Sequence, residues 1–225
     1  MEQPTFISIH TPKCAGSSVR SAIREHFGTM AFFDYGDGIG DPASPWNVDP
    51  LGQRDKAALH AAAVTNYQIV HGHFHPDKYD DVPNRRYITY MRDPVERALS
   101  HFFYWKSREP SNHSVWRYVC EYDVNFEEFC RLPSINRLYS GYFFAGFDLA
   151  KLSLVGFADR MDCFAEQMNK RFGLKLAVGQ ENRTVTPAYR EAKSRWLDTP
   201  KTRAKLTDFF REDLELYSAL RGRFA

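Results

Sequence analysis

The feature that most constrains the fold is a segment near the N-terminus in which an apolar run, a proline and a group of small residues follow one another. The run Phe6–Ile9 is short and rich in β-branched residues, which is typical of a buried strand. Pro12 ends that strand, because proline has no N–H to donate to a neighbouring strand. After Gly16, apolar residues recur at helical spacing as far as Gly28, a typical C-cap. The segment therefore predicts a strand, a tight turn and a helix.

This order brings the N-terminus of a helix to the carboxyl end of a strand. The first N–H groups of a helix have no partner within it, and the helix dipole adds partial positive charge, so such an end attracts anions. Lys13 adds a full charge at the same place. Taken alone, the segment is either a phosphate-binding loop or an ordinary turn with solvated side chains. The phosphate loop of kinases and NTPases fits less well, because Lys13 precedes Gly16 and the first glycine of that motif is absent.

Residues 67–75 predict a second strand that runs into a turn and carries three histidines at alternate positions. In an extended chain His71, His73 and His75 would point to the same side. Three imidazoles on one face could bind a metal, supply a base for proton transfer, or form a structural polar cluster. The residues alone leave these three interpretations open.

Residues 86–91 predict a third strand, and a strong helix start follows it. Asp93 is a typical N-cap, the next residue is proline, and Glu96 stands where a capping-box acid is expected. Ser100 lies two turns after the cap on nearly the same face, so Arg92 and Ser100 can share one ligand at the helix mouth. The alternative is that Arg92 pairs with Asp93 or Glu96 and that Ser100 is a small packing residue.

Strands that alternate with helices predict an α/β fold. We expect a three-layer, P-loop-like domain with a mainly parallel central sheet flanked by helices, and with ligands at the carboxyl ends of the strands. We expect one domain over residues 1–225. Beyond the segments above, the patterns predict a loop over 29–54, a fourth strand over 152–157, and helices over 57–64, much of 111–146, 159–172 and 200–221.

Composition narrows the possible partners. A formal charge of +2 is too small to indicate nucleic-acid binding. The 4 cysteines form no Cys-x-x-Cys pair, which argues against a zinc site of that type and favours thiols in a reducing compartment. No apolar run is long enough for a membrane span, and the first residues lack the pattern of a secretory signal. We therefore expect either a cytoplasmic protein or the trimmed catalytic domain of a longer one, and the oligomeric state is open.

Residues 10–18, His-Thr-Pro-Lys-Cys-Ala-Gly-Ser-Ser, resemble the 5'-phosphosulfate loop of carbohydrate-type sulfotransferases, of the kind that includes heparan-sulfate 2-O-sulfotransferases. These enzymes use 3'-phosphoadenosine 5'-phosphosulfate (PAPS) as donor and release 3'-phosphoadenosine 5'-phosphate (PAP). The family usually has threonine where this chain has Cys14, and often an apolar residue in place of Thr11. Arg92 with Ser100 resembles the family's 3'-phosphate motif, and the His-Gly-His turn resembles the segment that carries the general base in some members.

The resemblance implies transfer of a sulfuryl group from PAPS to an acceptor hydroxyl, with a carbohydrate as the first expectation and a small molecule as the second. His73 is the first choice for the base and His71 the second. Arg92 and Ser100 would hold the 3'-phosphate, and Arg183 would lie on a loop over the nucleotide. No metal is required, because Lys13 and the helix end supply the counter-charge. The residues assigned to the phosphosulfate are Pro12, Lys13, Cys14, Ala15, Gly16, Ser17 and Ser18.

Two other functions stay open, a P-loop-type nucleotide kinase or NTPase and a metal-binding module built on the histidines. The kinases and NTPases need Mg²⁺ and an acidic ligand, whereas the third strand ends in Met91 and Arg92. Aromatic residues in the middle of the chain are candidates for the core or for an acceptor groove, since sugars stack on aromatic faces. The groove candidates are Tyr104, Trp105, Arg108 and Tyr139.

Overall fold

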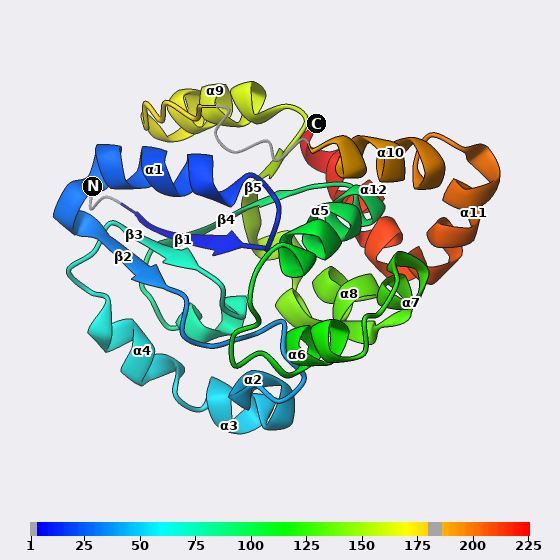
Figure 1. Ribbon diagram of the computed structural model, residues 1–225. Coiled ribbons are helices and arrows are strands. Elements are labelled where there is room, and N and C mark those ends of the chain that lie inside the picture. Colours follow the sequence, from blue (N-terminus) through cyan, green and yellow to red (C-terminus); the bar gives the residue numbers. More distant parts are fainter. Residues whose placement is uncertain (1–3, 180–185) are drawn as a thin grey trace.

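The computed structural model describes residues 4–179 and 186–225, and its centre is a five-stranded parallel sheet (Figure 1). The order of the strands is β2-β3-β1-β4-β5, and every neighbouring pair is parallel. The predicted α/β class with a mainly parallel sheet is confirmed. The strands are β1 (Thr5–His10), β2 (Ala31–Asp34), β3 (Ile69–Gly72), β4 (Arg85–Met91) and β5 (Leu152–Phe157).

Helices cover both faces of the sheet, which explains why the central strands β1 and β4 are buried over most of their length. Figure 1 shows α1 (Gly16–Phe27) and α9 (Met161–Phe172) on one side, and α4 (Ala57–Ala63) on the other. Ile7 and Ile9 of β1 are both fully buried. Short turns of helix connect these elements: η1 (Gly28–Met30), η2 (Pro76–Tyr79) and η4 (Leu149–Lys151).

A second hydrophobic cluster lies among the helices at the carboxyl edge of the sheet. Most of its buried residues lie on helices between residues 94 and 209, and they include Leu99, Phe129 and Leu206. These are the green and orange-red helices on the right of Figure 1. Their bounds are α5 (Pro94–Lys106), α6 (Ser114–Glu121), α7 (Phe126–Arg131), α8 (Pro133–Asn136), the π-helical η3 (Leu138–Phe143), α10 (Pro187–Trp196), α11 (Pro200–Phe209) and α12 (Arg211–Phe224).

The chain reverses its direction of travel across the sheet at β1, which pairs with β3 on one side and β4 on the other. In open α/β sheets, ligands bind at such a switch point, beside the carboxyl ends of the strands. The segments that follow β1, β3 and β4 begin with residues 11, 73 and 92. These are the three segments to which the sequence assigned chemistry, so the topology brings all three motifs to one edge.

Two predictions of secondary structure were wrong in detail. Residues 29–54 are not only loop, because they hold the edge strand β2 and the short helices α2 (Pro45–Val48) and α3 (Pro50–Arg54). The four residues of β2 are stabilised by pairing with β3, which local composition does not reveal. The predicted helix over 200–221 is two helices, which meet at the fully buried Phe210. In the part of the chain that the structure describes, no helix has both the length and the apolar character needed to cross a bilayer.

Candidate active site

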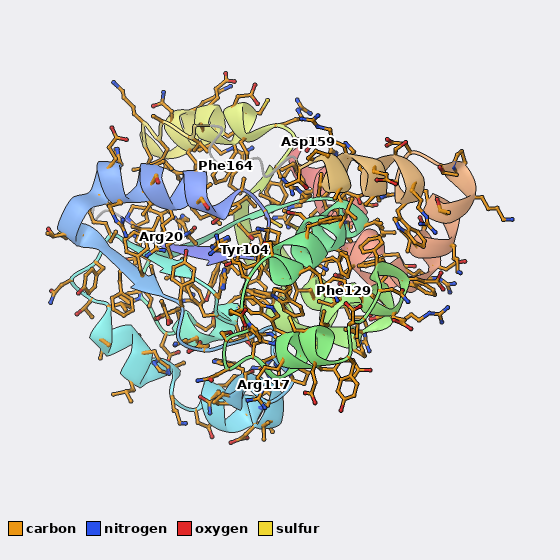
Figure 2. All side chains as sticks on the ribbon, viewed as in Figure 1. Arg20, Tyr104, Arg117, Phe129, Asp159 and Phe164 are labelled. Carbon is orange, nitrogen blue, oxygen red and sulfur yellow. The ribbon has the colours of Figure 1, made fainter. Side chains whose placement is uncertain are left out.

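A cavity of about 530 Å³ opens at the carboxyl edge of the sheet. Most of the residues with predicted roles line it, together with aromatic side chains from α5 and α6. Figure 2 labels one of these, Tyr104 on α5, beside the end of β1. The lining includes Pro12, Lys13, Ala15, Gly16, Ser17, His73, Arg92 and Ser100 from the prediction, and also His10, Tyr35, Tyr104, Trp105, Arg108, His113, Trp116 and Phe143.

The turn between β1 and α1 forms a cradle of backbone N–H groups. Lys13 and Ala15 both have left-handed backbones, with φ of 67° and 66°. Residues in this conformation cost on the order of 1–2 kcal/mol each, but they turn neighbouring N–H groups toward one side, as anion-binding loops do. The N-cap of α1 is Ala15, whose side chain makes no capping hydrogen bond. The open end of the helix and the turn together suit a phosphate or sulfate group.

Gly16 is required at the start of α1 by a close contact. A Cβ atom at this position would lie 1.7 Å from Nε2 of His10. The edge of the His10 imidazole therefore rests directly on the first residue of the helix. His10 lines the same cavity, so it is a site residue that the sequence analysis missed.

Lys13 carries its charge into the cavity. Its Nζ atom lies 4.0 Å from the centroid of the Tyr104 ring, a cation–π contact. Burial, followed by the charges of Arg92 and Arg108, lowers the pKa of Lys13 to about 8. No Asp or Glu is among the described residues that line the cavity. This set of donors suits an anionic ligand.

Arg92 and Ser100 lie on the same cavity, as the helix geometry predicted. Asp93 caps α5 by accepting hydrogen bonds from the N–H groups of Val95 and Glu96, at 3.0 and 3.1 Å, so the predicted helix start is confirmed. The other oxygen of Asp93 pairs with Arg203 at 2.7 Å instead of with Arg92. Within residues 4–179 and 186–225, no carboxylate forms an ion pair with Arg92, so its guanidinium is available to a ligand.

His73 is half-buried and faces the cavity. Its Nε2 atom lies 3.1 Å from Nδ1 of His10. Burial, followed by the charge of Arg20, lowers the pKa of His73 to about 4, so its imidazole is neutral at physiological pH. A neutral imidazole is the form that can accept a proton from a hydroxyl group.

His71 lies behind this pair and does not line the cavity. Its Nδ1 atom is 2.9 Å from the hydroxyl of Ser8, and its Nε2 atom is 3.4 Å from that of Tyr90. Complete burial lowers the pKa of His71 to about 3. The imidazole of His71 therefore supports the wall of the site from inside the protein.

His75 does not share a face with the other two histidines, so that prediction was wrong. The alternation stops because β3 ends at Gly72. The His75 ring turns away, donates a hydrogen bond from Nε2 to the carbonyl of Ala145 at 3.0 Å, and stacks on Trp46. In the described part of the chain, no group of three or more His, Cys, Asp or Glu side chains is placed to hold a metal ion.

Two residues of the predicted phosphosulfate loop point their side chains into the protein. Cys14 is fully buried, with Sγ 3.2 Å from the hydroxyl of Tyr139, and Ser18 is buried as well. Neither residue is among the described residues that line the cavity. Arg183 lies outside the described residues.

Tyr139 is a core residue and does not belong to a groove. It is fully buried, and its hydroxyl donates to the carbonyl of Arg92 at 2.9 Å while it contacts Cys14. The hydroxyl also accepts a hydrogen bond from the N–H of Arg92 at 3.3 Å. One side chain thus links the loop after β1 to the segment after β4. The other three groove candidates, Tyr104, Trp105 and Arg108, do line the cavity.

No family model matches the sequence, and no curated protein matches it. Among solved structures, the chain is similar to a sulfotransferase from Alicyclobacillus acidocaldarius, with 16% identity over 98% of this chain and 100% of that one and a TM-score of 0.42. It is also similar to mouse sulfotransferase SULT7A1 complexed with PAP, with 11% identity over 98% of this chain and 87% of that one and a TM-score of 0.52. The likeness to the mouse protein shows a sulfotransferase-like fold.

Proposed function

We propose that this protein is a sulfotransferase that moves a sulfuryl group from PAPS to the hydroxyl of an acceptor. The observation that carries the proposal is the convergence of a backbone anion cradle, Lys13, Arg92, Ser100 and a neutral His73 on one cavity without carboxylates in its described lining. PAPS supplies an activated sulfuryl group and two phosphate-bearing ends. The sulfotransferase-like fold and the PAP complex of the mouse protein support this interpretation.

The two anion sites would have different tasks. Lys13 and the N–H groups at the start of α1 would stabilise the negative charge that builds on the departing phosphate oxygen. Arg92 and Ser100 would hold the 3'-phosphate and fix the position of the donor, because arginine can bind a phosphate through two charge-assisted hydrogen bonds. Cys14 and Ser18 would contribute only backbone groups, since their side chains are buried.

His73 would remove the proton from the acceptor hydroxyl. It faces the cavity, whereas His71 does not, so His73 remains the first choice and His71 the second. With a pKa near 4, His73 alone is a weak base. The negative charge of the bound donor would raise the pKa of His73 toward neutrality, because a nearby anion favours the imidazolium form.

We infer a carbohydrate as the first candidate for the acceptor and a small hydroxyl compound as the second. The aromatic walls of the cavity, Tyr104, Trp105 and Trp116, offer flat faces on which sugar or aryl rings can stack. A nucleotide kinase is less well supported. That chemistry needs carboxylate ligands for Mg²⁺, and none is present among the described residues of the lining.

Calorimetry with PAP and AMP tests the proposal. We expect PAP to bind at least tenfold more tightly, because a hydrogen bond to a charged group contributes about 1.5–3 kcal/mol. Arg92→Ala should remove most of this preference, whereas the control Arg86→Ala, on an exposed residue of the same segment, should retain it. Equal affinities of the wild-type protein for PAP and AMP would contradict the assignment. A panel of glycans and phenols with radiolabelled PAPS would then identify the acceptor.

A further inference from the structure

His10, the last residue of β1, lies between the proposed base and the anion cradle. Its Nδ1 atom is 3.1 Å from Nε2 of His73 and 3.1 Å from the hydroxyl of Tyr35. Its opposite edge, which carries Nε2, rests on Gly16. The side chain is 9% exposed and lines the cavity. His10 therefore has one ring nitrogen on the base and the other on the start of the cradle.

The distance between the two histidines determines how many hydrogens they share. Two ring nitrogens 3.1 Å apart attract each other only if one hydrogen lies between them. A neutral imidazole carries a single N–H, so a neutral pair has one further hydrogen, and it must lie on one of the two outer nitrogens. The outer nitrogens are Nδ1 of His73 and Nε2 of His10. One end of the pair is therefore always a bare base while the other end is an N–H donor.

We propose that His10 and His73 form a proton relay that carries the acceptor's proton to the departing phosphate, an inference that rests on the proposed sulfuryl transfer. The acceptor oxygen bonds to sulfur as the bond between sulfur and the bridging phosphate oxygen breaks. The acceptor proton passes to Nδ1 of His73, and the hydrogen on Nε2 of His73 passes to Nδ1 of His10. The hydrogen on Nε2 of His10 then passes to the released phosphate oxygen. The pair ends neutral, with every hydrogen accounted for.

The surroundings of His10 and His73 disfavour an imidazolium, so they favour transfer of the proton to the phosphate. Lys13 and Arg20 place positive charge nearby, and both lower the pKa of His10, after burial and the neighbouring histidines. His71, stacked on His10 with a centroid distance of 5.4 Å, and Tyr35 complete the enclosure. No carboxylate among the described residues of the lining would pair with an imidazolium held here, and the charge of the donor itself is shared with Lys13. A relay avoids that state, because no histidine keeps the extra proton.

Histidine NMR tests the pairing without any turnover. If one hydrogen lies between the rings, both histidines must show the same tautomer, either both Nε2–H or both Nδ1–H. We expect this in ¹⁵N-labelled protein, with and without PAP, and we expect His10→Asn to change the tautomer population of His73. Opposite tautomers of His10 and His73 would overturn the relay. Failure of PAP to bind in calorimetry would instead overturn the proposed function.

Single-turnover hydrolysis of radiolabelled PAPS, with water as the acceptor, tests the relay itself. We expect His73→Ala and His10→Ala each to lower the rate by about 10²-fold or more, as for loss of proton-transfer catalysis. The double variant should be no more than about threefold slower than His73→Ala, because members of one unit do not add. The exposed His26→Ala serves as the control and should keep the wild-type rate.

His10→Asn separates a relay from simple positioning. Its amide can still hydrogen-bond to His73 but has no second ring nitrogen to pass a proton onward. We expect this variant to stay within about threefold of His10→Ala in rate and to bind PAP within about threefold of wild type. Recovery of the wild-type rate would show that His10 only orients His73. Losses that multiply in the double variant would show two independent roles, and either result would overturn the relay.

Discussion

Of the two proposed anion sites of this protein, one is formed by backbone groups and the other by side chains. The cradle after β1 consists of left-handed backbone at Lys13 and Ala15 and of the open end of α1. The second site consists of the side chains of Arg92 and Ser100, on a helix start of ordinary geometry. A backbone site depends on conformation and close packing, whereas a side-chain site depends on the identity of single residues. Substitutions should therefore affect the two sites in different ways.

Lys13→Ala should have the largest effect and should separate charge stabilisation from donor binding. We expect kcat to fall by about 10²–10³-fold, as when one donor to a developing oxyanion is removed, with a smaller change in the affinity for PAP. Steady-state kinetics with PAPS and calorimetry with PAP measure the two quantities. A loss confined to affinity would show that the ammonium group acts only in binding.

Gly16→Ala should damage the backbone site without changing any polar side chain. The new Cβ would meet the His10 ring, so the ring and the start of α1 must move apart. Overpacking of this kind costs about 1–3 kcal/mol, and we expect PAP affinity to fall by about 10-fold or more. Gly222→Ala is the matched control, because nothing lies within 4 Å of its Cβ position. Unchanged PAP binding in Gly16→Ala would mean that the cradle does not hold the donor.

The pH dependence of kcat/KM for the free enzyme should reflect both lowered pKa values. Lys13 must be protonated, so activity should fall about tenfold per pH unit above its pKa of about 8. His73 must be neutral, so activity should fall in the same way below its pKa of about 4 and stay nearly level between pH 5 and 7. Lys13→Arg should move the alkaline limb upward, because arginine stays protonated at these pH values. An acid limb near 6.5 in kcat/KM would show that His73 is not desolvated in the free enzyme.

Cys14→Ala should have the smallest effect on binding, although Cys14 lies in the middle of the predicted motif. Its side chain is buried against Tyr139 and does not reach the cavity. We expect PAP affinity within about threefold of wild type, measured by calorimetry, and a modest decrease in melting temperature from the lost packing. A large loss of affinity with unchanged stability would place the thiol in the binding site.

Local signals made much of this architecture predictable. A β-branched run before Pro12 and the cap at Asp93 each specify an element through their immediate neighbours, and both elements are present. The orientation of Cys14 was not predictable, because left-handed backbone at non-glycine residues has no local signature. The partnership of His10 and His73 joins residues 63 positions apart. Only the sheet, by pairing β1 with β3, brings these two histidines together.

The end of β3 shows why the histidine pattern misled. Alternation predicted that His75 would follow His71 and His73, but it holds only while the chain is extended. At Gly72 a Cβ would lie 1.5 Å from the carbonyl oxygen of Asp34. The backbones of β3 and β2 are therefore too close here for any residue other than glycine. The chain turns directly after that contact. A glycine between two histidines was the available signal for the end of the strand.

Tyr139 fixes the distance that a bound nucleotide would have to span. Its hydroxyl contacts Cys14 on one loop and the backbone of Arg92 on the other, and the backbone N–H of Tyr139 donates to the buried Asp213 at 3.0 Å. The spacing between the two anion sites is therefore set inside the core before any ligand arrives. A molecule with two phosphate ends must adopt that spacing itself. The conformational entropy lost on binding would come mainly from the nucleotide. The preorganised site would therefore select donors by the distance between their two phosphate groups.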